Sequence, residues 1–319
     1  KMLNKGNLDA IHGCVSTGKE ANVYHATSKD QTTGADIDYA IKVYKTSILV
    51  FKDREQYVSG DFRFRKGYSK SNPRKMVQLW AEKELRNLLR IGQAGIRCPT
   101  PIMLRLHVLV MSFIGSQGIA APRLKDAHVG QELMCELYAE AIKIMRVMWQ
   151  TCRLVHGDLS EYNILVYKGH LHIIDVSQSV EHDHPNALEF LRRDCGNVND
   201  YFKRNGVSTL TTRELFDFIC DITLADDQVE AHLDKMQQAL STREAPTAEE
   251  QVESAVFLQA FIPRSLAEVP HYERDVANLT GGGKQDLYYG ALTGVQPVAD
   301  QMDKKAATQP AAAPAAAAA

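Results

Sequence analysis

Two short stretches near the start of the chain, residues 23–26 and 39–44, alternate between apolar and polar residues. Successive side chains of a β-strand point to opposite faces of a sheet, so this alternation predicts two strands. A polar, glycine-containing stretch at residues 28–38 separates them, and a third alternating stretch, residues 107–113, stops at Gly115. The first part of the chain is therefore expected to be rich in β-structure.

Helical spacing is found in two longer segments, residues 76–91 and 130–154. A β-hairpin is predicted to follow the second segment, formed by residues 163–167 and 171–175 with its turn at Lys168–Gly169. The apolar residues that give the second segment its helical period are Leu133, Leu137, Ala141, Ile144, Met148 and Cys152.

The sequence after the hairpin is predicted to be mainly helical. One helix covers residues 186–204, and another begins at a capping box, in which Thr211 and Glu214 each bond the backbone N–H of the other. Residues 226–240 and 249–260 are also expected to be helical.

This order of elements predicts an α+β fold with two lobes, in which a β-rich N-terminal lobe contains one main helix and a helical C-terminal lobe carries the hairpin. We place the N-terminal lobe at residues 1–111, a hinge at residues 112–115 and the C-terminal lobe at residues 116–260. The remaining residues, 261–319, contain a run of three glycines and end in an alanine- and proline-rich sequence. This tail is expected to be largely flexible.

Composition narrows the class of protein. A chain of 319 residues with 45% hydrophobic residues and a formal net charge of -2 is typical of a globular protein and excludes a globally basic nucleic-acid-binding protein. No apolar run is long enough to span a bilayer, and polar residues interrupt the first positions, so neither a transmembrane helix nor a signal peptide is expected. The six cysteines include no C-x-x-C pair and are expected to be reduced.

Lys42 lies near the end of the second predicted strand, flanked by residues that would face a core. A buried lysine needs a carboxylate partner. In the helix predicted for residues 76–91, Glu84 falls near the middle of the apolar stripe, whereas Glu82 points away from it. A carboxylate on a buried stripe is costly unless it is paired, so we expect Glu84 to pair with Lys42. The alternative is a glutamate whose head group reaches solvent.

The segment between the long helix and the hairpin contains the pattern H-x-D-x-x-x-x-N, with His156, Asp158 and Asn163, and Asp175 ends the second predicted hairpin strand. Transfer of a phosphoryl group from ATP requires a carboxylate near the attacking group, oxygen ligands for Mg²⁺ and a lysine on the phosphates. Asp158, Asn163 and Asp175 have the spacing that kinases use for the carboxylate and the ligands. The sequence therefore predicts an ATP-dependent phosphotransferase.

Several segments around these residues are distinctive: S-T-G-K-E-A-N-V-Y at residues 16–24, Y-K-T-S-I-L-V-F at residues 44–51 and I-D-V-S-Q-S-V at residues 174–180. With residues 156–163 and 181–185, they make the chain from about Gly13 to Asp221 resemble the RIO family of atypical serine/threonine protein kinases, and its RIO-one-like branch in particular. The resemblance implies a protein-kinase-like fold, binding of ATP and Mg²⁺, and weak protein serine kinase activity. It further implies that the protein acts mainly as an ATPase in the late cytoplasmic maturation of the small (40S) ribosomal subunit.

The resemblance also implies a role for each matching site residue. Lys42 would hold the phosphates, Glu84 would position Lys42, and Asp158 would be the base. Asn163 and Asp175 would bind the metal. In this family the residue matching Asp175 is also proposed to accept the γ-phosphate as an aspartyl phosphate, and a metal-bound carboxylate is an acceptable nucleophile for phosphorus.

Adenine would be held by the hinge backbone at Ser112 and Ile114, and the nucleotide loop would contribute Ser16, Thr17 and Lys19. This loop departs from ordinary kinases, because residues 13–20 replace the usual G-x-G-x-x-G. They nearly spell the P-loop motif G-x-x-x-x-G-K-[ST]. A glutamate stands in place of the hydroxyl residue, however, and a strand is predicted to follow instead of a helix, so we reject a P-loop NTPase.

Two further differences from ordinary kinases concern the segments that would bind a peptide substrate. Gly157 stands where many kinases have an arginine that senses activation-loop phosphate, and no A-P-E follows Asp175. The usual activation and peptide-docking segment is therefore expected to be missing, which argues against a broad range of protein substrates.

The segment of residues 45–75 carries nine lysines and arginines against three acidic residues, a net charge of +6, interleaved with five aromatic residues. Such a basic insertion suits an RNA backbone with stackable bases, although a solvated loop has the same composition. With the family resemblance, the expected partners are the pre-40S particle with its ribosomal RNA and ribosome-assembly proteins. A membrane or DNA partner is not expected.

Two other functions share some of these features. A small-molecule kinase of the aminoglycoside or choline type has the same catalytic pattern, but it would need an acidic, helical substrate pocket, for which the stretch after Asp175 is short. A catalytically inactive scaffold would not need all five of the predicted catalytic positions to be filled, and here they are.

Overall fold

The protein is described by a computed structural model that covers residues 8–30, 32–46, 72–241 and 256–258. The chain divides into two units, residues 1–219 with 232–245 and residues 220–231 with 246–319. The predicted tail at residues 261–319 and most of the basic insertion lie outside the described residues, as does most of the helix predicted for residues 249–260.

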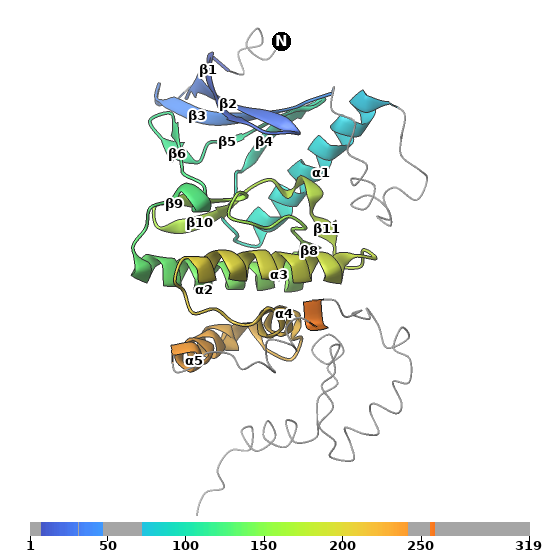
Figure 1. Cartoon of the computed structure of the whole chain (residues 1–319). Coiled ribbons are helices and arrows are strands. Elements are labelled where there is room, and N and C mark those ends of the chain that lie inside the picture. Colours follow the sequence, from blue (N-terminus) through green and yellow to red (C-terminus); the bar gives the residue numbers. More distant parts are fainter. Residues whose placement is uncertain (1–7, 31, 47–71, 242–255, 259–319) are drawn as a thin grey trace, which may run out of the picture. The chain divides into compact units, whose positions relative to one another are not determined.

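A five-stranded antiparallel sheet forms the N-terminal part of the first unit (Figure 1). Its strands lie in the order β1-β2-β3-β5-β4. The predicted strands at residues 23–26, 39–44 and 107–113 are confirmed as β2, β3 and β5. The bounds are β1 Ala10–Thr17, β2 Ala21–Lys29, β3 Asp36–Tyr44, β4 Pro101–Arg105 and β5 Val108–Ser112.

Helix α1, Pro73–Gln93, confirms the helix predicted for residues 76–91 and packs against β4 and β5. It begins where Asn72 accepts hydrogen bonds from the N–H groups of Arg74 and Lys75 (3.1 and 3.3 Å), with a proline at the first helical position. Its apolar stripe is buried and consists of Val77, Trp80, Ala81, Leu88 and Ile91.

The C-terminal lobe of the first unit is mainly helical, and α2 and α3 lie next to each other below the hairpin (Figure 1). The helix predicted for residues 130–154 ends earlier, at Gln150, because the chain turns at Arg153, which has a φ of +54°. The first elements of this lobe are β6 Gly115–Ser116, β7 Ile119–Ala120, the 3₁₀ helix η4 Leu124–Asp126, α2 Gln131–Gln150 and β8 Leu154–Val155.

The predicted hairpin is confirmed by β9, Ile164–Tyr167, and β10, His170–Ile173. Lys168 and Gly169 both have positive φ, +52° and +79°, as in a type I′ turn. The second strand is shorter than predicted: it ends at Ile173, so Asp175 lies two residues beyond it. The chain then passes through the 3₁₀ helix η5, Val176–Gln178, and β11, Val180–Glu181, and enters α3, Ala187–Arg204.

The predicted capping box is present at the start of α4, Thr212–Cys220. The Glu214 N–H donates to Thr211 Oγ1 (3.1 Å), and the Thr211 N–H donates to Glu214 Oε2 (2.8 Å). The last elements, η6 Asp226–Gln228 and α5 Val229–Ser241, confirm the helix predicted near residues 226–240. No described helix is both long and apolar enough to cross a bilayer. All six cysteines are free thiols.

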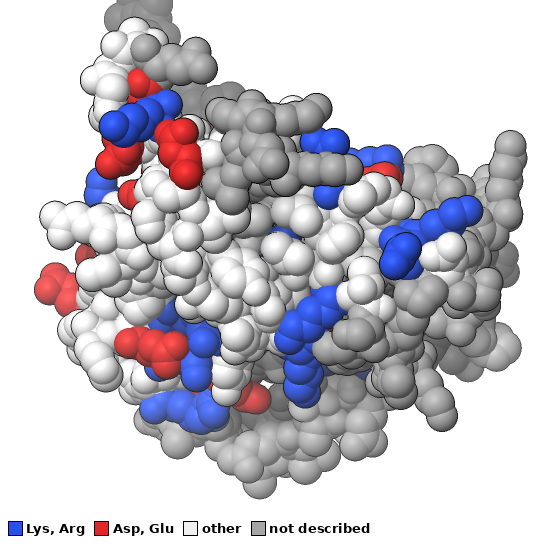
Figure 2. All heavy atoms as spheres, turned by 90° about the horizontal axis from the view of Figure 1, so that it is seen from above, with Lys and Arg blue, Asp and Glu red and all other residues white. Residues whose placement is uncertain are grey.

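Charged side chains are spread over the face drawn in Figure 2. The lysines and arginines of the described residues lie at several separate places on this face, with uncharged residues between them. The described residues of this face therefore do not form one continuous basic surface.

Candidate active site

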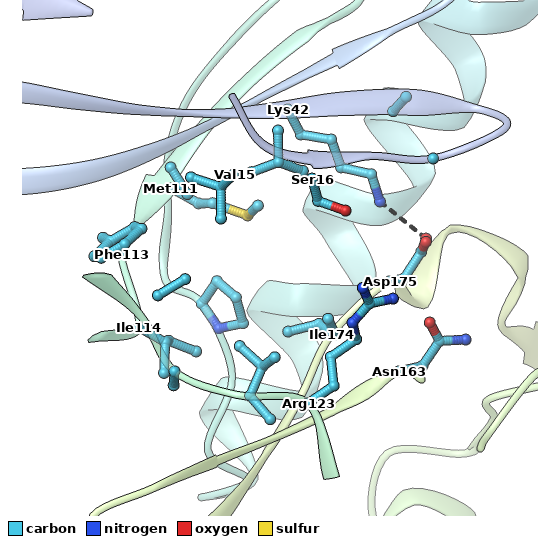
Figure 3. Close-up of a pocket in the computed structure, with 18 of the residues that line it drawn as sticks. Val15, Ser16, Lys42, Met111, Phe113, Ile114, Arg123, Asn163, Ile174 and Asp175 are labelled. Carbon is cyan, nitrogen blue, oxygen red and sulfur yellow. Dashed lines mark hydrogen bonds and ion pairs between the residues drawn. The ribbon is translucent and has the colours of Figure 1, made fainter. Parts of the chain in front are cut away.

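A cavity of about 410 Å³ lies between the sheet and the β9–β10 hairpin (Figure 3). Sheet residues such as Ala40 line one side and hairpin residues such as Leu165 line the other. Thr17 and Asp158, which were predicted as site residues, are not part of the lining. The predicted site residues that do line it are Ser16, Lys19, Lys42, Glu84, Ser112, Ile114, Asn163 and Asp175.

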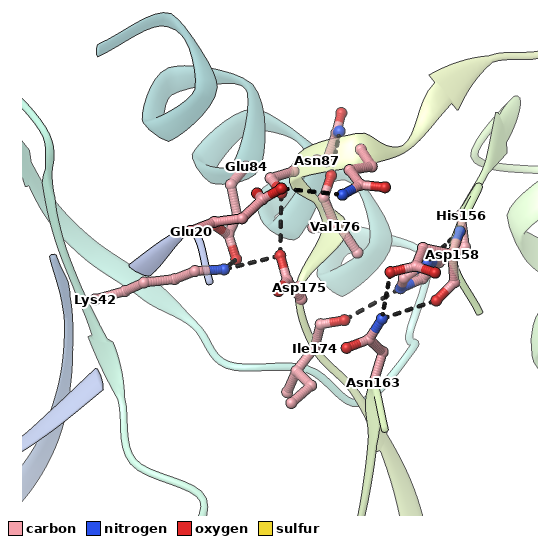
Figure 4. A network of polar contacts seen from close by, with 12 residues as sticks. Glu20, Lys42, Glu84, Asn87, His156, Asp158, Asn163, Ile174, Asp175 and Val176 are labelled. Carbon is pink, nitrogen blue, oxygen red and sulfur yellow. Dashed lines mark hydrogen bonds and ion pairs between the residues drawn. The ribbon is translucent and has the colours of Figure 1, made fainter. Parts of the chain in front are cut away.

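The Lys42 ammonium forms ion pairs with two carboxylates at the inner end of the cavity (Figure 4). Lys42 Nζ lies 2.8 Å from Glu84 Oε1 and 2.9 Å from Asp175 Oδ1. The expected pairing of Lys42 with Glu84 is thus present. Burial alone would lower the pKa of Lys42, but the two carboxylates outweigh it and raise the pKa above its ordinary value, so the ammonium stays charged.

Glu84 is almost completely buried, with 1% of its side chain exposed. Burial raises its pKa to about 7, because desolvation outweighs the attraction of Lys42 and the Asp175 charge adds to it. Its second oxygen, Oε2, has no hydrogen-bond partner among the described residues. Glu84 therefore depends on Lys42 for its only ion pair in this part of the chain.

Asp175 has a left-handed backbone, with φ +58° and ψ +57°, which is uncommon for a residue other than glycine and is often found at functional sites. Its Oδ1 accepts hydrogen bonds from Lys42 and from Ser177 Oγ (3.0 Å). Burial would raise the pKa of Asp175, but Lys42 and the hydrogen bonds lower it below the ordinary value. With 43% of its side chain exposed, Asp175 presents an ionised carboxylate to the cavity.

The loop after β8 holds Asp158 and Asn163 together. Asn163 Nδ2 donates to the backbone oxygen of Asp158 (2.8 Å) and to its Oδ2 (3.1 Å), as Figure 4 shows. Partial desolvation raises the pKa of Asp158, although His156 and the Asn163 hydrogen bond oppose the shift. His156 is buried, and its Nε2 lies 3.1 Å from the backbone oxygen of Ile174, which links this loop to Asp175.

A carboxylate of α3 that was not predicted from the sequence, that of Asp194, holds the same loop. Asp194 is 1% exposed, and its two oxygens accept hydrogen bonds from the N–H groups of Gly157 (2.8 Å) and Leu159 (2.9 Å). Burial raises the pKa of Asp194 to about 7 despite these bonds. Asp194 lies on an apolar helical stripe, the same pattern that identified Glu84, so the sequence did contain a signal for it.

Three residues of the predicted hinge, Ser112, Phe113 and Ile114, line the opposite end of the cavity. The Ser112 N–H donates to the Thr100 oxygen (2.9 Å), and the Ile114 oxygen accepts from the Ala121 N–H (3.0 Å). No described residue accepts a hydrogen bond from the Ile114 N–H, so this donor is available to a ligand in the cavity.

The predicted nucleotide loop, residues 13–20, consists of the second half of β1 and the turn that leads into β2. The Gly18 N–H donates to the Ala21 oxygen (2.9 Å), and Lys45 Nζ donates to the Gly18 oxygen (2.7 Å). A side chain at Gly18 would approach the Ala21 oxygen to 3.1 Å, so this turn favours glycine. Strand β2 begins directly at Ala21, and the predicted difference from a P-loop, which leads into a helix, is therefore confirmed.

Asn163 and Asp175 fit a magnesium ion that is completed by phosphates. The described hydrogen bonds of Asn163 use its Nδ2, and those of Asp175 use its Oδ1, which leaves one side-chain oxygen of each for a cation. The described residues contain no group of three or more His, Cys, Asp or Glu suited to a metal. Mg²⁺ commonly binds one or two protein oxygens together with substrate phosphates and water, which matches this pair.

Known proteins with similar sequences are kinases of one family. The family model of the RIO domain matches residues 22–215. The chain is 55% identical to serine/threonine-protein kinase rio1 of Dictyostelium discoideum over 295 residues, which is 92% of this chain and 50% of that protein. Against RIO1 of Homo sapiens the identity is also 55%, over 91% of this chain and 51% of that protein. This chain therefore spans about half the length of these relatives.

The fold resembles solved Rio2 kinase structures from Chaetomium thermophilum. One, an ADP/Mg²⁺-phosphoaspartate complex, has a TM-score of 0.51 at 20% identity, over 75% of this chain and 74% of that one. A second has a TM-score of 0.52 at 19% identity, over 76% of each chain. At this identity the likeness concerns the fold, and it confirms the two-lobed α+β architecture expected from the sequence.

Proposed function

Because this chain belongs to the RIO family of atypical protein kinases, we propose that it is an ATP- and Mg²⁺-dependent phosphotransferase that works mainly as an ATPase. The observation that carries the proposal is the Lys42 ammonium held between Glu84 and Asp175 at one end of a cavity whose other end is the hinge. A cavity of about 410 Å³ is large enough for a nucleotide.

The two ends of the cavity would bind different parts of ATP. The free N–H of Ile114 would donate to an adenine nitrogen, with the backbone of Ser112 beside it. At the other end Lys42 would contact the phosphates, while Glu84 keeps the ammonium in place. Ser16 at the end of β1 and Lys19 of the β1–β2 turn line the cavity and would lie over the phosphates, with Thr17 between them in the sequence.

Asn163 and Asp175 would hold Mg²⁺, which supplies charge neutralisation of the phosphates when it is bound. Their placement on different elements, the loop after β8 and the residue before η5, allows them to approach an ion from two directions. The fixed Nδ2 contacts of Asn163 keep its amide oxygen oriented for this role.

We propose that turnover passes through an aspartyl phosphate on Asp175. Its carboxylate is ionised and exposed to the cavity, as a nucleophile must be. An Asp175 oxygen attacks the γ-phosphorus, an O–P bond forms, and the bond to the β-phosphate oxygen breaks, so that ADP leaves with the electron pair. A water, deprotonated by Asp158, then attacks the phosphorus, which releases phosphate and restores the carboxylate. The Rio2 complex with ADP, Mg²⁺ and phosphoaspartate supports this route.

The wider role also remains a proposal. We infer from the family that the protein acts in the cytoplasm on late maturation of the small (40S) ribosomal subunit, with weak serine kinase activity as a second reaction. Its partners would be the pre-40S particle, its ribosomal RNA and ribosome-assembly proteins. Relatives at 55% identity over most of the chain favour this function over a small-molecule kinase of the aminoglycoside or choline type.

The test is to turn over γ-labelled ATP with and without small-subunit precursors, quench in acid and map the label. We expect label on Asp175 that is lost in neutral hydroxylamine, and faster turnover with precursors. Hydroxylamine-resistant label on serine with none on Asp175 would contradict the aspartyl phosphate, and turnover that precursors leave unchanged would contradict the ribosomal role. No ATP turnover at all would favour the inactive scaffold.

A further inference from the structure

Three polar residues of α1, Glu84, Asn87 and Arg90, follow one another at intervals of three positions. Residues with this spacing form one oblique row along a helix. Glu84 bonds Lys42 of the sheet, whereas the other two residues contact the chain that follows Asp175. One row of α1 is thus bonded to the sheet at one position and to the C-terminal lobe at two.

The first contact with the C-terminal lobe is buried. Asn87 is 2% exposed, and its Nδ2 donates to the backbone oxygen of Val176 at 2.9 Å (Figure 4). Val176 directly follows Asp175, so this bond fixes the backbone next to the left-handed residue. Loss of this bond would leave the Val176 oxygen desolvated and unpaired, so the contact favours one position of the backbone after Asp175.

The second contact is an ion pair. Arg90 Nη1 lies 2.9 Å from Glu181 Oε1 and 2.8 Å from Oε2, and the two side chains are 37% and 17% exposed. Glu181 belongs to β11, which pairs with β8 through Glu181 opposite Leu154. His156 of the loop that carries Asp158 follows β8 directly. Arg90 is therefore connected, through Glu181 and the pairing of β11 with β8, to the loop that carries the proposed base Asp158.

We propose that Asn87 and the Arg90–Glu181 pair are positioning residues: they fasten α1 to the segments that carry Asp175 and Asp158 and so keep Glu84 against Lys42. The inference rests on the proposed function. Two contacts on one rigid helix fix its position relative to the segment after Asp175, and Asp175 itself bonds Lys42, so Glu84 is held beside the same ammonium. Because residues 176–186 pass directly through η5 and β11 into α3, these bonds take the place of a separate activation segment.

A different result is expected if the Arg90–Glu181 pair only stabilises the fold and does not position Glu84. Partly exposed ion pairs usually contribute little to stability, and the loss of such a pair lowers stability slightly without changing the reaction. If α1 positions Glu84, by contrast, loosening it disturbs Lys42 and the phosphates but leaves the hinge intact. Adenosine, which has no phosphates, should then bind normally while ATP turnover falls.

The test uses Arg90→Glu, Glu181→Arg and the double variant that exchanges the charges. Each single variant should lower turnover at saturating ATP about tenfold, with the Kd for adenosine changed less than about twofold. The exchange should restore turnover to within about threefold of wild type. Asn87→Leu, which keeps the volume but removes the bond to Val176, should lower turnover in the same way.

Arg86→Glu is the matched control, because Arg86 lies on the same helix in an exposed pair with Glu82 (3.5 Å). It should leave turnover unchanged, and thermal unfolding confirms that each variant is folded. If the charge reversals unfold the protein, Arg90→Gln replaces them. Single variants as active as Arg86→Glu, or an exchange variant as slow as the slower single one, would overturn the positioning role. Absence of turnover in the wild type would instead refute the proposed function.

Discussion

Replacing Lys42 with methionine should make the stability of the folded protein fall more steeply above pH 7 than the stability of the wild type does. Lys42→Met removes the ammonium but leaves Glu84 buried, with 1% of its side chain exposed. Burial raises the pKa of Glu84 to about 7 even with Lys42 in place, and Lys42 is the main group that lowers it. Without that cation we expect the pKa to rise well above 7.

The direction in which stability changes with pH follows from proton linkage. A carboxyl group whose pKa is higher in the folded than in the unfolded chain binds more protons when folded, so stability is lost as pH rises between the two pKa values. In the wild type this loss ends near pH 7, the folded pKa of Glu84. In the variant it continues at about 1.4 kcal/mol per pH unit. Between roughly pH 7 and pH 8.5 the variant should therefore lose about 1.5 to 2 kcal/mol more than the wild type.

Urea unfolding at a series of pH values measures this difference, with the buried Trp80 and Trp149 as fluorescent probes. Asp194, whose pKa is also raised to about 7, is common to both proteins and cancels. The control is Lys42→Met with Glu84→Gln, in which the contribution of Glu84 to the extra pH dependence should be lost. Any pH dependence that remains in the control belongs to Asp175, whose pKa Lys42 also lowers. A constant difference between Lys42→Met and wild type from pH 6.5 to 8.5 would refute the dependence of Glu84 on Lys42.

Three further predictions concern other parts of the site and the fold. Asp158→Asn should slow hydrolysis of the labelled intermediate by about 10²-fold or more, so that hydroxylamine-sensitive label accumulates; loss of label would contradict its role as base. Ile114→Pro removes the free hinge N–H and should weaken adenosine binding about tenfold by calorimetry, with unchanged binding excluding this contact. Thr211→Ala removes the cap that bonds the Glu214 N–H (3.1 Å) and should lower stability by about 1 kcal/mol, with ATP turnover unaffected.

The elements that could be predicted have strong local patterns. The 20-residue α2 repeats its apolar period over many turns, and Lys168–Gly169 has the residues that a tight hairpin turn needs. The pairing of Lys42 with Glu84 could be predicted for the same reason, since a lone carboxylate on an apolar stripe must find a cation. A sequence pattern suffices where burial on one face leaves few alternatives.

The elements that could not be predicted lack such a pattern. Strand β1 is largely exposed along its length, so neither of its faces demands apolar residues. Strands β8 and β11 have two residues each, too few to show a period, and exist because they pair with each other although they are 25 to 27 positions apart in the sequence. The Arg90–Glu181 pair joins residues that are far apart in the sequence, and nothing local distinguishes either partner.

The left-handed backbone of Asp175 has a consequence for inhibitor design. One class of inhibitor would bind a conformation in which Asp175 and Val176 turn out of the site. Here such a turn would break the bonds from Lys42 and Ser177 to Asp175 and the buried bond from Asn87 to Val176. A compound that requires the turned-out state would have to offset all of these losses. Ligands that fill the cavity from the hinge and leave Asp175 in place are therefore the better chemical starting point for this protein.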